Sequence, residues 1–592
     1  MANYLCMPAT GGARTYPSRH GAWRLGVSAL GLALLGLTLP GVASFGATAS
    51  TTAPSPTAWF TYSRPAKYSA VYSFVEIPMR DGAKLACDLQ QPGSGMAGQL
   101  DPPGTPAAPG RFPGIIDNYT PYDAPDGLSA TSANPFATLG YDVLNCDQRG
   151  LDRSKVTAPG QSWTQPYAAI QTQDNYDMIE WLAAQPFSNG WIGQTGGSAG
   201  AQTSTLVATR RPPHLRAIVS LTAADNLYSD SRYKGGVFMA WGPAWAFLAG
   251  GLSAGGVNPA VVTAQFVAHK LDDPYWQQMS PSSEFSSLTI PDLQLEGWQD
   301  TDFPAGALRI FEGTKANIDP KNPQNTGPWV VQGPWGHEGS PACSPSPACG
   351  VTLAFFDHYV GGYRGAPLPP ARVQMYQEPT PATGAGTWQL FGTWPPPGAK
   401  NLTLNLDPGQ KLSTRAIGNG TDTYRAGPSD VATAGTPLER ADQFLAFTSS
   451  PLSHDLFVAG DPFLRLLASL TARDGIFSVQ IQDVGPDGAV VDVNTVPWLL
   501  KASHRLSNTS LSPVVPGRMT PYTVPGWSMD YKFAQGDRIR VKIASAPDEL
   551  PPATSPSPNT ILDAPPAGDV SVQLGHGGSY LVLPVLGAGG GT

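Results

Sequence analysis

The sequence predicts an α/β fold over roughly its first two thirds and an all-β fold over the remainder. From residue 71 to about residue 369, short apolar runs typical of strands alternate with helical patterns. Such alternation favours a mostly parallel sheet covered by helices. The interval 226–287 interrupts this pattern and is rich in Trp, Phe, Ala and Gly, so we expect it to form a helical cap. After residue 370, short strands with period-two alternation recur between turn residues, as in a β-sandwich.

The composition excludes some classes of protein. The chain has 592 residues, with 66 glycines, 61 prolines and only 14% charged residues. This length predicts several structural units, and this composition suits loop-rich β structure. The net charge is −8 and no basic block occurs, so nucleic acid is not expected as a partner.

The N-terminus has the features of an export signal. Arg14, Arg19 and Arg24 precede an apolar run over residues 25–39, and small residues follow. We therefore predict a signal peptide over residues 1–47 and export to the periplasm or the extracellular space. The alternative is a membrane anchor, but the run is short for a span and ends at Pro40. After cleavage, no stable membrane span is expected.

Individual elements follow in order. Residues 48–70 are rich in Thr, Ala, Ser and Pro and are predicted to be a linker. An α/β domain is expected over residues 71–225 and, after the cap, over 288–369; the all-β domain is expected over 370–592. In the α/β part we predict strands at 71–77, 84–89, 112–117, 141–146, 191–195, 217–221, 293–295 and 329–332, and helices at 172–185, 201–208 and 353–360. In the all-β part we predict strands at 402–406, 463–469, 476–484, 538–543 and 580–585.

One stretch of the α/β part carries a motif with a chemical meaning. Gly196-Gly197-Ser198-Ala199-Gly200 is a G-x-S-x-G turn between a predicted strand and a predicted helix. This is the nucleophile elbow of α/β-hydrolases, in which a strained turn exposes a serine hydroxyl. A second match, around Ser253, follows a stretch without strand character and is expected to be a glycine-rich loop. The context therefore favours Ser198 as the nucleophile.

A serine nucleophile needs a base and an acid that orients the base. Asp300 follows the predicted strand at 293–295, and His337 follows the strand at 329–332. The order Ser, Asp, His is that of α/β-hydrolases, and the carboxyl ends of parallel strands are where such a sheet places its site. We predict a triad of Ser198, His337 and Asp300. Asp302 is the rival candidate for the acid.

The cysteines suggest a disulfide and no metal site. Cys6 would be removed with the signal peptide. Cys343 and Cys349 lie in one Ser/Pro-rich loop, which in an exported protein favours a local disulfide. Cys87 and Cys146 lie in predicted strands, where they could be buried thiols, and their redox state stays open. No spacing typical of metal ligands occurs, so no metal and no cofactor are predicted.

Several further motifs resemble one family. The segments are Pro78-Met79-Arg80-Asp81-Gly82, Asp147-Gln148-Arg149-Gly150, Asp273-Pro274-Tyr275-Trp276, Gly297-Trp298-Gln299-Asp300, Gly333-Pro334-Trp335-Gly336-His337, Phe356-Asp357-His358-Tyr359 and Trp394-Pro395-Pro396. They resemble the cocaine-esterase-like (CocE/NonD) hydrolases, which are related to X-prolyl dipeptidyl-peptidases and α-amino-acid ester hydrolases. The resemblance runs from about residue 70 to the end. It implies an α/β-hydrolase domain, an inserted helical cap and a C-terminal jelly-roll (galactose-binding-like) sandwich, and it favours Asp300 over Asp302.

The resemblance also implies an oxyanion hole. Thr120-Pro121-Tyr122-Asp123 is similar to the family's N-P-Y-D segment, so the Tyr122 hydroxyl and the Ala199 N–H are the expected donors. The family usually has tyrosine after the serine, where this chain has Ala199. A backbone donor survives that change, but side-chain contacts with a substrate do not. The specificity of known members is therefore not transferred.

Three functions compete at this point. The first is an exported serine hydrolase that cleaves carboxylic esters, or amides, through an acyl-enzyme, with a small-molecule substrate. The second is an X-prolyl dipeptidyl-peptidase, which would need a carboxylate for the substrate's α-amine; Asp126, Asp225 and Glu296 are the candidates. The third is a protein whose jelly-roll binds carbohydrate or a surface. The substrate and the oligomeric state do not follow from the sequence.

Overall fold

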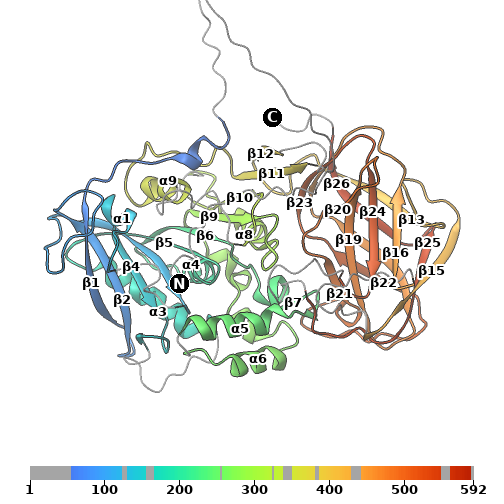
Figure 1. Ribbon diagram of the computed structural model, residues 1–592, viewed down its shortest axis with the longest axis horizontal. Helices are drawn as coiled ribbons and strands as arrows, with labels where there is room; N and C mark the ends of the chain where they lie inside the picture. The colour runs from blue at the N-terminus through green and yellow to red at the C-terminus, as the bar shows by residue number, and fades with distance from the viewer. Residues whose placement is uncertain are drawn as a thin grey trace, which may run out of the picture.

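The computed structural model describes residues 55–122, 130–154, 166–253, 256–322, 326–337, 350–379, 386–428, 442–547 and 560–587. Two parts lie side by side in Figure 1, an α/β part drawn in blue to yellow and an all-β part drawn in orange to red. The predicted signal peptide, Asp123, Asp126, Cys343 and Cys349 fall outside the described residues. Within these ranges, no helix is both long enough and apolar enough to cross a membrane.

The α/β part is built on one twisted sheet. Its strands are β1 (Ser69–Pro78), β2 (Lys84–Gly93), β3 (Phe112–Thr120), β4 (Asp142–Asp147), β5 (Ser188–Gly197), β6 (Leu215–Leu221), β9 (Asp292–Gly297), β10 (Pro328–Gly333), β11 (Val373–Pro379) and β12 (Thr387–Phe391). Pairing gives the order β1-β2-β4-β3-β5-β6-β9-β10-β11-β12. The six strands β4, β3, β5, β6, β9 and β10 are mutually parallel, so their carboxyl ends share one edge. The predicted parallel sheet is confirmed.

Both faces of this sheet are buried beneath helices. Ile115 packs into one hydrophobic cluster and the next residue, Ile116, into another, because successive strand side chains point to opposite faces. The first cluster includes residues of α1 (Pro135–Thr138) and α9 (Gly350–Tyr359), and the second includes residues of α3 (Ala169–Ala183) and α4 (Ala199–Thr209). The near-continuous apolar runs of the strands follow from burial on two sides.

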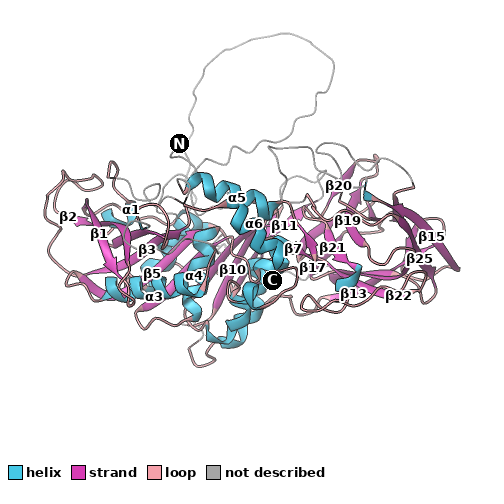
Figure 2. Cartoon of the chain, turned by 90° about the horizontal axis from the view of Figure 1, so that it is seen from below, coloured by secondary structure: helices cyan, strands magenta, loops and turns pink. Residues whose placement is uncertain are grey.

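The interval in which the sequence predicts a cap lies between β6 and β9. It contains the π-helical turn η3 (Tyr228–Arg232), β7 (Tyr233–Lys234), β8 (Val237–Phe238), α5 (Trp241–Leu252), α6 (Pro259–Ala268), α7 (Pro274–Gln277) and η4 (Pro281–Ser287). In both views α5 and α6 lie together at the border between the two parts, and Figure 2 shows them towards the viewer. The cap also touches the all-β part, because the N–H of Lys501 donates to the carbonyl of Gly235 at 2.8 Å.

The all-β part closes around one large hydrophobic core. Its strands are β13 (Lys400–Asp407), β14 (Lys411–Ser413), β15 (Asn419–Ala426), β16 (Phe444–Ser449), β17 (Leu456–Gly460), β18 (Phe463–Leu470), β19 (Ile476–Val484), β20 (Val490–Asp492), β21 (Trp498–Lys501), β22 (Thr520–Pro525), β23 (Met529–Phe533), β24 (Arg538–Ala544), β25 (Gly568–Gly575) and β26 (Tyr580–Leu586). In β18, buried and half-buried residues alternate strictly, which is the pattern expected of a half-covered strand. The all-β prediction is confirmed, while the finer expectation of a jelly-roll stays a prediction.

Two strands of the α/β sheet are joined covalently. Cys87 on β2 and Cys146 on β4 lie directly opposite each other in the antiparallel register and form a disulfide. Both side chains are fully buried. The sequence left this pair open, because the pairing of β2 with β4 cannot be derived from spacing alone.

Candidate active site

The turn at Ser198 joins β5 to α4 in a strained conformation. Ser198 has φ of 52° and ψ of −112°, a backbone conformation that non-glycine residues rarely adopt. Its N–H donates to the carbonyl of Leu221 at 2.9 Å, so the neighbouring strand β6 holds the turn in place. Such a turn lifts the hydroxyl above the carboxyl edge of the sheet, which is the geometry of a nucleophile elbow.

The two outer glycines of the motif have little room for a side chain. A Cβ on Gly196 would lie 2.7 Å from backbone atoms of Gly200, closer than real Cβ atoms approach. A Cβ on Gly200 would lie 2.4 Å from Oδ1 of Asn118 on β3. Gly196 therefore cannot carry a side chain in this turn, whereas a side chain at position 200 would have to displace the Asn118 amide.

The three residues predicted as a triad form one hydrogen-bonded chain. Nε2 of His337 lies 2.8 Å from Oγ of Ser198, and its Nδ1 lies 2.8 Å from Oδ2 of Asp300. His337 follows β10 and Asp300 follows β9, so neighbouring strands bring them together. These distances suit proton transfer between a serine hydroxyl and an imidazole whose second nitrogen is held by a carboxylate.

Burial and hydrogen bonding oppose each other at Asp300. The side chain is fully buried, and desolvation alone would raise the pKa of its carboxyl group. The charge and the hydrogen bond of His337, with the nearby Glu296 carboxyl and a hydrogen bond from the N–H of Phe303, outweigh burial and lower that pKa to about 2. Asp300 is thus an anion at neutral pH, as an acid that orients a histidine must be.

The expected oxyanion donors lie on either side of Ser198. Tyr122 follows β3; its hydroxyl accepts a hydrogen bond from the indole N–H of Trp245 at 2.7 Å and lies close to the side chain of Ser198. Burial raises the pKa of Tyr122 to about 12, so the phenol keeps its proton and can donate it. Ala199 is the first residue of α4, where backbone N–H groups have no partner within the helix.

The rival residues have other roles in the structure. Asp302 contacts Ser231 and lies 3.4 Å from Nη1 of Arg232, while its own N–H donates to Asp300. The imidazole of His337 is bound to Asp300 instead. Ser253 is buried at the end of α5 and accepts the N–H of Val257 at 3.0 Å. The prediction of a glycine-rich loop around Ser253 was wrong for Gly251 and Leu252, which are the last residues of α5; residues 254–255 lie outside the described residues.

The candidate carboxylates for an α-amine are occupied where they are described. Asp225 lies 3.7 Å from Nη1 of Arg309, and Glu296 is buried behind Asp300 with one oxygen accepting the N–H of Gly297. Asp126 lies outside the described residues. The described residues hold no cluster of three His, Cys, Asp or Glu side chains that could bind a metal ion.

Comparison of the sequence with known proteins identifies a family. Residues 81–260 and 252–339 match the X-Pro dipeptidyl-peptidase (S15 family), and residues 366–567 match the X-Pro dipeptidyl-peptidase C-terminal non-catalytic domain. Cocaine esterase of Rhodococcus sp. is 25% identical over 559 residues, covering 81% of this chain and 91% of that protein. Together the two family matches span most of the chain, which belongs to the S15 family of serine hydrolases.

Two further proteins are similar to this chain. A protein classed as a serine esterase in Mycobacterium bovis is 24% identical over 624 residues, covering 83% of this chain and 94% of that protein. A CocE/NonD family hydrolase from Staphylococcus aureus superposes with a TM-score of 0.70 at 19% identity, covering 87% of this chain and 93% of that chain. The second comparison shows a shared fold.

Several family motifs outside the triad are structural. Arg149 of the Asp147-Gln148-Arg149-Gly150 segment is buried and pairs with Asp174 on α3 at 2.5 Å and with Asp81 at 2.6 Å. Asp357 on α9 accepts hydrogen bonds from Arg64 and Tyr141. These contacts tie loops and helices to the sheet that carries Ser198.

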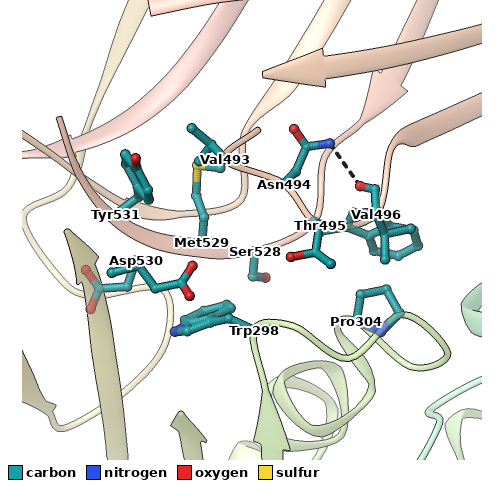
Figure 3. Close-up of a pocket in the computed structure, with 12 residues that line it drawn as sticks. Trp298, Pro304, Val493, Asn494, Thr495, Val496, Ser528, Met529, Asp530 and Tyr531 are labelled. Atoms are coloured by element: carbon teal, nitrogen blue, oxygen red, sulfur yellow. Dashed lines mark hydrogen bonds between the residues drawn. The ribbon is translucent and has the colours of Figure 1, made fainter. Parts of the chain in front are cut away.

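A small cavity lies behind the Asp300 turn, at the border of the two parts. Trp298 and Pro304 line it from the α/β side, and Asn494, Met529 and other residues of the all-β part close it (Figure 3). Its volume is about 30 Å³, enough for very few water molecules. The cavity is too small for a substrate, so we assign it to interdomain packing.

Proposed function

We propose that this chain hydrolyses carboxylic esters through an acyl-enzyme on Ser198. The observation that carries the proposal is the hydrogen-bonded chain from Ser198 through His337 to Asp300 at the carboxyl edge of the sheet. The family relationship supports a hydrolase that uses serine. The strained backbone of Ser198 and the nearby hydroxyl of Tyr122 add the two further parts that acyl transfer requires.

In the first half of the reaction, Nε2 of His337 takes the proton of Ser198 as Oγ attacks the ester carbonyl carbon. The carbonyl oxygen becomes an oxyanion and accepts hydrogen bonds from the Tyr122 hydroxyl and the Ala199 N–H. When the intermediate collapses, protonated His337 gives its proton to the departing alcohol. Asp300 keeps the imidazole oriented and stabilises its positive charge.

In the second half, water replaces the alcohol. His337 takes a proton from the water as its oxygen attacks the acyl carbon, and the same oxyanion donors serve again. Collapse releases the carboxylic acid, and His337 returns the proton to Oγ of Ser198. The same machinery can act on amides, for which protonation of the leaving nitrogen by His337 is the more demanding step.

The described residues favour an ester over an Xaa-Pro peptide as substrate. An X-prolyl dipeptidyl-peptidase needs a carboxylate for the α-amine of its substrate. In the described chain, Asp225 shares Arg309 with Asp230, which lies nearer to the guanidinium, while Asp302 is paired with Arg232 and Glu296 is buried against Asp300. A buried carboxylate that already has a cationic partner offers little further attraction to an amine.

A panel of substrates tests the proposal. Purified protein is compared on aryl esters, acyl amides and Xaa-Pro-anilides, with Ser198→Ala as the matched control. We expect the highest kcat/KM on an ester and none above background in the control. The highest kcat/KM on an Xaa-Pro-anilide would assign the dipeptidyl-peptidase activity instead. Inertness of the folded protein toward all three classes and toward a fluorophosphonate would favour a binding role for the all-β part.

Export is a separate part of the proposal. It is supported by the basic and apolar N-terminal segment and by the Cys87–Cys146 disulfide, because disulfides persist mainly in oxidising compartments. N-terminal sequencing of protein from the producing cells tests it. We expect a mature chain that begins near residue 47, found outside the cytoplasm. A full-length chain in the cytoplasm would overturn this part alone.

A further inference from the structure

The hydroxyl of Tyr122 has a partner that belongs to the cap. Nε1 of Trp245, on α5, donates a hydrogen bond to this hydroxyl at 2.7 Å. Trp245 is only 3% exposed, so water does not compete strongly for either group. The indole N–H can only donate, and it therefore occupies an acceptor site of the phenol oxygen.

This contact constrains the direction of the Tyr122 proton. A phenol hydroxyl rotates and can point its proton at any nearby acceptor. With Trp245 donating to the oxygen, the proton points away from the indole and can be directed to an acceptor beside Ser198, whose side chain lies close to the hydroxyl. A chain of donors is also cooperative, because each bond polarises the next. The hydroxyl is therefore preset to donate towards the site where the oxyanion forms.

The indole is itself held in place by a buried cation. Cζ of Arg232 lies 5.2 Å from the centroid of the Trp245 ring, within the range of a cation–π contact. Arg232 is 2% exposed and pairs with Asp302, two residues after Asp300. A positive charge over the ring withdraws electron density and makes the N–H a better donor. The cap thus connects the loop that carries Asp300 with the loop that carries Tyr122.

We propose that Trp245 is a positioning residue, which directs the hydroxyl proton of Tyr122 towards the oxyanion and makes cap helix α5 a part of the oxyanion hole. This inference rests on the proposed function, in which Tyr122 is a donor to the oxyanion. It deepens that function by assigning a task to a residue that does not touch the reacting atoms.

A double-mutant cycle tests the inference. The variants are Trp245→Phe, Tyr122→Phe and the double variant, each measured for kcat and KM on an ester. Trp241→Phe is the matched control: Trp241 lies one turn earlier on α5, packs against the same cluster, and its Nε1 has no hydrogen-bond partner. Circular dichroism and thermal unfolding establish that each variant is folded.

We expect Trp245→Phe to lower kcat roughly threefold to tenfold with little change in KM, as for the loss of one neutral hydrogen bond. Trp241→Phe should retain the wild-type kcat. In the Tyr122→Phe background, Trp245→Phe should lower kcat by less than about twofold, because the group that it positions is absent. Independent effects that multiply in the double variant, or a wild-type kcat in Trp245→Phe, would overturn the inference.

A second measurement separates positioning from packing. A boronic acid binds serine hydrolases as a tetrahedral adduct that mimics the oxyanion, whereas a ground-state carboxamide analogue does not. Trp245→Phe should weaken boronate inhibition by the same factor as kcat and leave inhibition by the carboxamide unchanged. Equal weakening of both inhibitors would assign Trp245 to packing of the pocket. A wild-type kcat in Tyr122→Phe would instead remove the proposed role of Tyr122, independently of these results.

Discussion

The carboxyl group of Glu296 is buried beside the carboxylate of Asp300, the residue that holds His337. Glu296 is 1% exposed, and its Oε1 accepts the N–H of Gly297 at 2.9 Å. Burial and then the negative charge of Asp300 raise the pKa of Glu296 well above its usual value, so it is a neutral acid that can donate a proton. Two buried carboxylates in contact cannot both be ionised at modest cost, and here the proton stays on Glu296.

Removing this donor should slow the reaction. Glu296→Leu removes a donor beside the Asp300 anion, and charge-assisted hydrogen bonds contribute about 1.5–3 kcal/mol, so we expect kcat to fall at least about tenfold. Glu296→Gln keeps an N–H donor of similar shape and should retain most of the activity. Equal losses of kcat in the two variants would show that a donor at position 296 does not contribute to catalysis.

The same pair predicts how stability depends on pH. The folded state binds the Glu296 proton more tightly than the unfolded state, so this group stabilises the fold fully at low pH, and its contribution falls as pH rises above about 4.5. Glu296→Gln should therefore lose less unfolding free energy than the wild type between pH 4.5 and 8, as measured by urea denaturation. Parallel pH curves for the two proteins would contradict the assignment of a neutral Glu296.

The nucleophile is tested by labelling with an organophosphonate. Ser198→Ala should abolish labelling, because Oγ of Ser198 is the hydroxyl bonded to His337. Loss of a triad member typically costs several orders of magnitude in turnover. Ser253→Ala, in the second G-x-S-x-G match, is the control and should be labelled like the wild type. Persistent labelling of folded Ser198→Ala would sink the assignment.

The proximity of Ser198, Asp300 and His337 could be predicted from the sequence, because it depends only on the order of these residues and on the strands that they follow. Parallel strands bring their carboxyl ends to one edge, so residues far apart in the chain converge without any knowledge of side-chain packing. The GWxD motif of the family resemblance favoured Asp300 over Asp302. The structure agrees, since the loop turns Asp302 towards Arg232.

Other features could not be derived in this way. Trp245 lies in a helix without charged residues, where nothing local marks one tryptophan as a hydrogen-bond donor. Glu296 was a candidate for binding an amine, and its place between Leu295 and Gly297 in a central strand was a signal of burial that sequence reasoning did not use. The Cys87–Cys146 pair depends on β4 returning beside β2, which is a property of strand order. Helix α8 (Gly306–Thr314) was missed because it is short and contains two glycines.

The Cys87–Cys146 disulfide should stabilise the α/β part. It closes a loop of 59 residues, for which the chain-entropy model gives about 4 kcal/mol. The double variant Cys87→Ala/Cys146→Ala should therefore unfold at a clearly lower urea concentration. Wild-type protein unfolded in the presence of reductant should have the same urea midpoint as the variant. An unfolding midpoint that reductant does not move would refute the bridge. The predicted bridge between Cys343 and Cys349 is a separate question, which peptide mapping without reduction answers.

The Tyr122→Phe variant tests whether the Tyr122 hydroxyl donates to the oxyanion. The hydrogen bond of this hydroxyl is stronger to an oxyanion than to the neutral carbonyl of the bound ester, so removing it should lower kcat and leave KM nearly unchanged. Loss of one oxyanion donor costs about 10²–10³ in rate, or roughly 3–4 kcal/mol. Tyr122→Phe keeps the ring, and phosphonate labelling at Ser198 reports that the site remains accessible. Tyr119, three residues before Tyr122, is fully buried in β3. Tyr119→Phe should therefore keep wild-type kcat, and a loss of turnover there rather than in Tyr122→Phe would reverse the assignment of the donor.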